Sequence, residues 1–140
     1  FERASLQRGY QVYTEVCSGC HSMELLSYRN LMEEGGPEFS EAQVKAMAAA
    51  FEVKGAPDEY GDVVMRPAIL SDKFVSPYEN EQQGRAANGG AYPPDLSVMV
   101  KARHGGADYV YSLLLGYEDA PEGMVLVFGY DKRFCMKKIS

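Results

Sequence analysis

The sequence has no apolar run long enough to cross a membrane and no excess of basic residues. Its longest strongly apolar run, residues 109–115, is far shorter than the ~20 residues that a membrane-spanning helix needs. The 14 lysines and arginines face 20 acidic residues, and the net charge of −6 disfavours nucleic acid as a partner. Internal repeats, low-complexity tracts and a basic-then-apolar leader are absent too, so we expect a mature or excised segment. A length of 140 residues predicts one soluble globular domain.

Cysteine and histidine are also scarce, with three cysteines and two histidines in the whole chain. Two of the cysteines and one histidine lie together as Cys17-Ser18-Gly19-Cys20-His21. A Cys-x-x-Cys-His string is the signature of covalent haem attachment, because each thiol can add to one vinyl group while the imidazole reaches the iron. The motif therefore predicts Cys17 and Cys20 as haem attachment points and His21 as the iron ligand.

Two other interpretations of this motif are less favoured. A thioredoxin-like redox pair belongs near a strand-helix-strand unit and gains nothing from the histidine. A zinc site needs four ligands, and beyond the motif the chain offers only His104 and Cys135. We expect Cys135 to be an ordinary thiol, although a lone thiol in an oxidising compartment invites pairing with another molecule.

Negative charge is concentrated in residues 33–62. This stretch holds eight acids and two bases, and its net charge of −6 equals the net charge of the whole chain. Such a segment creates a negative potential that speeds the encounter with a basic partner, and the alternative is a merely solvated face. The eight acids are Glu33, Glu34, Glu38, Glu41, Glu52, Asp58, Glu59 and Asp62.

Apolar periodicity predicts a helix over residues 5–17 that delivers the Cys-x-x-Cys-His motif. A capping box begins at Ser40 and precedes Val44 and Met47, which predicts a second helix that residues 55–57 should end.

The second half of the chain is expected to be less regular. Residues 57–94 are rich in Pro, Gly, Asn and Asp without a sustained period, which predicts a long irregular segment that wraps a ligand. Residues 95–103 and 107–116 follow as two short helices separated by glycines.

Four blocks of sequence, together with the Cys-x-x-Cys-His motif, are specific enough to indicate a family. They are Gln7-Arg8-Gly9-Tyr10-Gln11-Val12-Tyr13, Met65-Arg66-Pro67, Asn88-Gly89-Gly90-Ala91-Tyr92-Pro93-Pro94-Asp95-Leu96-Ser97 and Arg103-His104-Gly105-Gly106-Ala107-Asp108-Tyr109. These blocks resemble the cytochrome c1 family, the haem subunit of quinol–cytochrome c reductases. The resemblance runs from about residue 5 to residue 124, so we expect a haem domain at residues 1–124 and an unaligned tail at residues 125–140.

The resemblance implies a mainly α, class I-like c-type cytochrome domain whose long irregular loops wrap one covalent haem c. It implies a single-electron carrier, not catalytic alone, that takes electrons from a Rieske iron–sulfur protein and gives them to a basic cytochrome c docked on residues 33–62. Cytochrome b would share the complex. The place would be the periplasmic side of a bacterial inner membrane or the mitochondrial intermembrane space, with membrane contact through a segment outside this sequence.

Roles for single residues also follow from the resemblance. Asn88, Pro93 and Pro94 match the loop that closes over the haem, where prolines form a rigid apolar wall. Arg103 matches an arginine that pairs with a haem propionate.

The resemblance also gives three further expectations. Arg85 is a weaker second candidate for the propionate, and Tyr109 matches a haem-contacting tyrosine. His104 matches a structural position, so we expect it to be a buried, hydrogen-bonded imidazole rather than a second axial ligand.

The sixth iron ligand stays open at this stage. Family members supply a methionine from a proline-rich loop, and neither Met124 nor Met136 has such a neighbourhood. An open sixth position would favour the alternatives: a haem-based small-ligand binder or sensor, or a peroxidase-like enzyme. The absorption spectrum of the reduced protein separates these classes.

Overall fold

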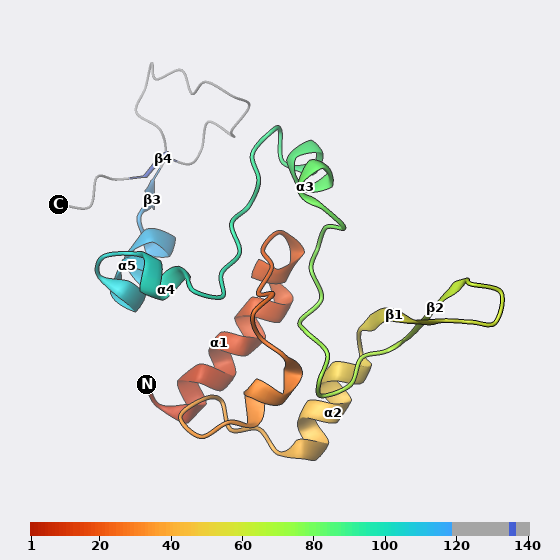
Figure 1. Ribbon diagram of the computed structural model, residues 1–140. Helices are drawn as coiled ribbons and strands as arrows, with labels where there is room; N and C mark the ends of the chain where they lie inside the picture. The colour runs from red at the N-terminus through yellow and green to blue at the C-terminus, as the bar shows by residue number, and fades with distance from the viewer. Residues whose placement is uncertain (119–134, 137–140) are drawn as a thin grey trace.

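The computed structural model describes residues 1–118 and, beyond them, the backbone of residues 135 and 136. Short helices joined by long connections dominate the described residues, as expected for a mainly α chain (Figure 1). Two small antiparallel pairs of strands accompany them, β1 with β2 and β3 with β4. The elements are α1 Arg3–Glu15, η1 Cys17–Gly19, η2 Tyr28–Met32, α2 Glu41–Ala49, β1 Glu52–Pro57, β2 Val63–Pro67, α3 Glu81–Ala87, α4 Met99–Ala102, α5 Gly106–Leu115, β3 Tyr117–Glu118 and β4 Cys135–Met136.

Helix α1 leads directly into the Cys-x-x-Cys-His motif, close to the predicted range of residues 5–17. It ends at Glu15, and the 3₁₀ turn η1 then carries the first cysteine. No residue of α1 is fully buried, but Tyr10 and Tyr13 pack against the core from one face. The backbone N–H groups of Cys20 and His21 both donate to the carbonyl of Cys17, at 3.1 and 2.8 Å. The motif is therefore one tight turn at the end of a surface helix.

The hydrophobic core is small and lies under α1. Phe74 stands at its centre, with ring centroids 5.1 Å from Tyr28, 5.9 Å from Tyr13 and 6.0 Å from Tyr10. Aromatic pairs at such distances contribute about 0.5–1.5 kcal/mol each beyond their buried area, so they fasten α1 to the body. The buried members of the core are Tyr28, Leu31, Val44, Ala48, Ala68 and Phe74.

Helix α2 begins as predicted and ends earlier than predicted. Ser40 and Gln43 form the expected capping box, and Val44 is fully buried. The helix stops at Ala49, so the prediction that residues 55–57 end it is wrong. Those residues belong to β1 instead, which pairs with β2 in an antiparallel hairpin. Gly55 serves this pairing, because a Cβ at that position would lie 2.7 Å from the Val64 carbonyl oxygen.

The expectation of an irregular segment over residues 57–94 is also wrong in part. Strand β2 and helix α3 both lie within it, and α3 is capped by Asn80, whose side chain accepts from the Gln83 N–H at 2.9 Å. Helix α4 is shorter than the expected 95–103, since residues 95–97 make their hydrogen bonds with residues 22–25 instead. Helix α5 lies where it was predicted, after Gly105 at φ +86°.

Residues 70–74 tie the middle of the chain to the segment after the motif. Backbone N–H groups of Tyr28 and Arg29 donate to residues 72 and 70, and Phe74 donates back to Leu26, all within 3.1 Å. The Arg66 guanidinium reinforces this contact with a two-pronged bond to Asp72, at 2.7 and 2.9 Å. In the described part of the chain, no helix is both long and apolar enough to cross a membrane.

Candidate functional site

The His21 imidazole is held by the backbone of a distant segment. Its Nδ1 atom lies 2.8 Å from the carbonyl oxygen of Pro94. A carbonyl oxygen only accepts hydrogen bonds, so Nδ1 carries a proton, and in the neutral imidazole Nε2 then keeps its lone pair. This is the tautomer that binds a metal through Nε2. The geometry thus places a proline next to the predicted ligand.

The segment after Pro94 is fastened to the segment after His21 by the Asp95 carboxylate. Its Oδ2 accepts from the Ser22 hydroxyl and from the Glu24 N–H, both at 2.8 Å, and its Oδ1 accepts from the Ser97 N–H at 2.8 Å. Burial works to raise the pKa of Asp95, but the hydrogen bonds from Ser97, Glu24 and Ser22 together hold it below its ordinary value. Sequence reasoning gave Asp95 no role, although Asp-x-Ser is a signal for such side-chain to backbone bonds.

Tyr13 connects α1 to the same site. Its hydroxyl donates to the His21 carbonyl oxygen at 3.3 Å. Burial, with smaller contributions from Asp95, Cys17 and Tyr10, raises the pKa of Tyr13 to about 12, so the phenol stays neutral and remains a donor. The apolar periodicity predicted the helix that carries Tyr13 but not this contact.

The two motif cysteines fit covalent attachment of a haem. Cys17 is partly buried, Cys20 is exposed, and both are free thiols on the same turn. A turn with two available thiols beside an imidazole whose Nε2 is free provides the donor set that a c-type haem requires. Within residues 1–118 no group of three or more His, Cys, Asp or Glu side chains could hold a metal ion, so the zinc interpretation gains no support.

The loop around Pro93 and Pro94 packs on the motif, and Asn88 anchors its beginning. The Asn88 amide donates to the Tyr78 hydroxyl at 2.9 Å and to the Gly84 carbonyl at 2.7 Å, which caps the end of α3. Pro93 lines a small pocket together with Cys20. The structure therefore brings the prolines to the motif and gives Asn88 a structural task beside them.

Arg103 and Arg85 differ in what occupies their guanidinium groups. Arg85 is bound by the Glu81 carboxylate at 2.7 Å and also donates to the Gly90 carbonyl at 2.9 Å. Arg103 is exposed, and the only acceptor that the described residues offer it is the adjacent Ala102 carbonyl at 3.3 Å. Arg103 is accordingly the better placed of the two to bind a further anion.

The two remaining predicted residues of this region, Tyr109 and His104, differ in burial. Tyr109 is partly buried on α5 and lies close to Gly105, where an added Cβ would be 3.3 Å from the Tyr109 Cβ. His104 is exposed, so the prediction of a buried imidazole is wrong. The positive φ angles of Gly105 and Gly106 turn the chain sharply into α5 and leave His104 on the surface. In the described part of the chain, no hydrogen bond joins Arg103 or Tyr109 to the motif.

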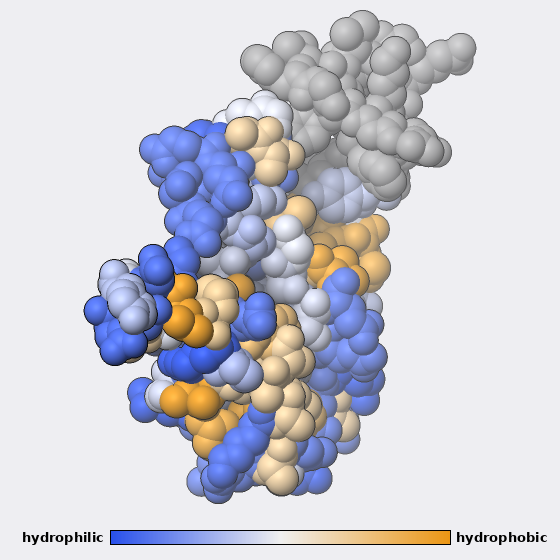
Figure 2. Space-filling view, turned by 90° about the vertical axis from the view of Figure 1, so that its right-hand side faces the viewer, coloured by the Kyte–Doolittle hydropathy of each residue, from blue (hydrophilic) through white to orange (hydrophobic). Residues whose placement is uncertain are grey.

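The acids of residues 33–62 are all exposed, and six of the eight lie in two places, while Glu41 and Glu52 begin α2 and β1 between them. One group follows η2 beneath α1, and the other lies at the tip of the β1–β2 hairpin, which projects from the body (Figure 1). Asp58 shapes that tip, because its Oδ1 accepts from the Tyr60 and Asp62 N–H groups, both at 2.9 Å. Figure 2 looks onto the side from which the hairpin projects and shows hydrophilic and hydrophobic surface interspersed.

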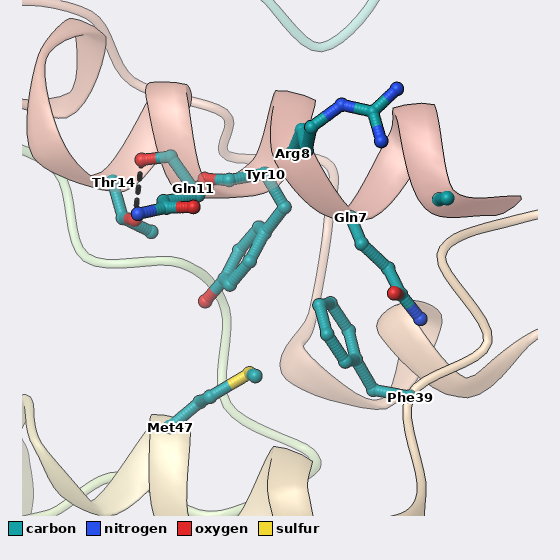
Figure 3. A pocket seen from close by; sticks show the side chains of 8 residues that line it. Gln7, Arg8, Tyr10, Gln11, Thr14, Phe39 and Met47 are labelled. Carbon is teal, nitrogen blue, oxygen red and sulfur yellow. Dashed lines mark hydrogen bonds between the residues drawn. The ribbon is translucent and has the colours of Figure 1, made fainter.

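Hollows flank α1 on two sides. The hollow in Figure 3, of about 520 Å³, lies between α1 and α2, where Tyr10 and Phe39 face Met47. The other, of about 550 Å³, is more apolar and is lined by Gly9 and Leu26 among others. The side chains of Met124, Met136 and Cys135 lie outside the described residues, so the expectations for them stay predictions, as does the boundary at residue 124.

Comparison with known proteins gives a family for the chain. A sequence model of the Cytochrome C1 family matches residues 1–139. "Cytochrome c1 1, heme protein, mitochondrial" of Arabidopsis thaliana is 52% identical over 124 residues, 89% of this chain and 39% of that protein. "Cytochrome b-c1 complex catalytic subunit, mitochondrial" of Candida albicans is 52% identical over 130 residues, 92% of this chain and 44% of that protein. "Cytochrome b/c1" of Bradyrhizobium diazoefficiens is 44% identical over 155 aligned positions, 96% of this chain and 23% of that protein. The chain therefore spans less than half the length of each of these curated relatives.

Proposed function

This chain belongs to the cytochrome c1 family, and from that membership and the geometry around His21 we infer that it binds one covalent haem c and carries single electrons. The observation that carries this inference is the 2.8 Å contact between His21 Nδ1 and the Pro94 carbonyl, which leaves Nε2 free for iron next to two free thiols. When bound, the haem supplies a ferric/ferrous couple that accepts one electron and passes it on.

The residues of the chain hold and tune that group. The thiols of Cys17 and Cys20 would hold the haem covalently, each through addition across one of its vinyl groups. His21 would hold the iron through Nε2, and Pro93 and Pro94 would help to keep water away from it. Further along the chain, Arg103 would pair with a propionate and Tyr109 would pack on the ring, as the resemblance to the family implies.

The partners follow from the family and from the charge of the surface. The electron comes from a Rieske iron–sulfur protein and leaves to a basic cytochrome c, in a complex that contains cytochrome b. The Candida relative is named as a subunit of the cytochrome b-c1 complex, which supports this assembly. Exposed acids at the hairpin tip and below α1 offer the negative potential that a basic carrier needs. The domain then faces the mitochondrial intermembrane space or a bacterial periplasm.

Acid extraction of the denatured protein tests the covalent haem. Haem should stay on the wild-type polypeptide, and it should be released from the double variant Cys17→Ala/Cys20→Ala. Free haem from the wild-type protein would refute the proposal. A sensor or a peroxidase-like enzyme needs an open sixth iron position, and no observation on residues 1–118 favours either. Carbon monoxide added to the reduced protein distinguishes these two alternatives from an electron carrier whose sixth position is filled, because it binds readily only where that position is open.

A further inference from the structure

We propose that Asp95 is a positioning residue for the iron ligand: its carboxylate holds the Pro94 carbonyl against His21 and so sets the orientation and the donor strength of the imidazole. This inference rests on the proposed haem site. The hydrogen bonds that Asp95 accepts come from Ser22, Glu24 and Ser97, so Asp95 acts on the imidazole only through its neighbours.

The carboxylate joins the two chain segments that meet at the imidazole. Ser22 follows His21 directly and is 5% exposed, and its hydroxyl donates to Asp95 Oδ2 at 2.8 Å. Asp95 itself follows Pro94 directly. Each end of the 2.8 Å bond between His21 and Pro94 is thus one residue away from a bond that Asp95 makes or anchors.

Other hydrogen bonds join the same two segments. The Leu96 N–H donates to the Ser22 carbonyl at 2.9 Å, and the Leu25 N–H donates to the Ser97 hydroxyl at 3.1 Å. The Ser97 hydroxyl is in turn held in place because the Ser97 N–H donates to Asp95. Hydrogen bonds to a charged carboxylate are roughly twice as strong as neutral ones, so Asp95 contributes most to holding the two segments together. The Pro94 carbonyl cannot move relative to His21 without breaking several of these bonds.

Loss of the carboxylate should weaken the bond between His21 Nδ1 and Pro94. A hydrogen bond accepted from Nδ1–H raises the basicity of a ligating imidazole and fixes its ring. A more basic imidazole favours ferric over ferrous iron. A weaker bond should therefore raise the reduction potential and change the ferric electron paramagnetic resonance spectrum.

The test uses the full protein with its haem in its complex, as wild type and as Asp95→Ala, Asp95→Asn and Ser22→Ala. The readouts are the midpoint potential from a redox titration and the ferric resonance spectrum. For D95A we expect the ferrous-to-ferric ratio at a fixed potential to rise roughly threefold to tenfold, tenfold being about 59 mV for one electron. D95N keeps one acceptor oxygen and S22A removes one donor, so both should shift in the same direction by less.

Asp72→Ala is the matched control. Asp72 also accepts three hydrogen bonds, two from Arg66 and one from the Ile69 N–H, but it makes none to residues 21–25 with its side chain. D72A should lower the melting temperature and leave the potential and the spectrum unchanged.

The outcomes separate the possible failures. A D95A protein that melts earlier but keeps the wild-type potential and spectrum, as D72A should, would overturn the positioning role. If D95A does not fold, unchanged values in D95N and S22A overturn it equally. Haem that extracts freely from the wild-type protein would instead overturn the proposed function.

Discussion

His21 Nδ1 and the Pro94 carbonyl oxygen lie 2.8 Å apart although the two residues are 73 positions apart in the sequence. This contact fixes which nitrogen of the imidazole is free, and it joins the Cys-x-x-Cys-His motif to the proline-rich loop. The motif supplies the donor atoms, and the loop supplies their orientation. Function is thus shared between two segments that no local pattern connects.

Gly84 should be intolerant of any side chain, with consequences for the proline-rich loop. A Cβ at this position would lie 2.6 Å from two ring atoms of Tyr92 and 3.1 Å from Tyr78. Gly84→Ala should therefore cost about 1–3 kcal/mol of the free energy of unfolding, measured by urea denaturation. Gln82→Ala, on the exposed face of α3, is the control and should be near neutral. Equal stability of the two variants would show that the rings move aside at no cost.

The exposed acids should steer a basic cytochrome c. Glu34, Glu59 and Asp62 are exposed, and neutralising all three as E34Q/E59Q/D62N should slow association and flatten its salt dependence. The reason is screening, since the Debye length falls from about 10 Å at 0.1 M to about 3 Å at 1 M salt. Stopped-flow electron transfer at a series of ionic strengths measures the rate.

A control with the same change in net charge completes this test. Exposed acids outside residues 33–62 serve for it, in the variant E2Q/E15Q/D108N. This variant should keep most of the wild-type rate and salt dependence. If both triple variants slow the reaction alike, net charge rather than the predicted docking stretch controls the encounter.

One buried and one partly buried tyrosine should make the protein sensitive to alkali. Burial is the main cause that raises the pKa of Tyr13 and of Tyr28 to about 12. Unfolded tyrosines ionise near pH ~10, so between about pH 10 and 12 the unfolded chain binds fewer protons and stability falls as the pH rises. Tyr13→Phe and Tyr28→Phe should each flatten this fall in urea midpoints from about pH 8 to about pH 11. Tyr60→Phe, at an 83% exposed position, should leave the pH dependence as it is, and a flattening there would contradict the argument.

Local patterns predict the first third of the fold well. The helical period of α1 follows from Tyr10 and Tyr13, which meet the core around Phe74, and the capping box of α2 needs only neighbouring residues. The β1–β2 hairpin was missed because Gly55 and Pro57 usually end structure. Here Gly55 lets two strands approach closely, a requirement set by a partner strand rather than by its neighbours.

The candidate site likewise has a part that local sequence patterns predict and a part that depends on distant residues. The motif is local and can be found from the sequence, whereas the task of Asp95 depends on partners 71 to 73 positions away. The resemblance supplied Pro94 without its carbonyl contact, and it led to a buried His104 that the turn at Gly105 leaves exposed. One signal was available and unused: Glu81 and Arg85 are spaced to form a helical ion pair, which makes Arg85 less available to a further anion than Arg103.

The central claim is that a haem is bonded to Cys17 and Cys20. Its most direct test is the mass spectrum of the tryptic peptide between Arg8 and Arg29, residues 9–29, which contains both cysteines and His21. The account predicts that this peptide carries the added mass of one haem, has no thiol left for alkylation and absorbs in the Soret region. A peptide of unmodified mass with two thiols that alkylate, or with a disulfide between them, would contradict it.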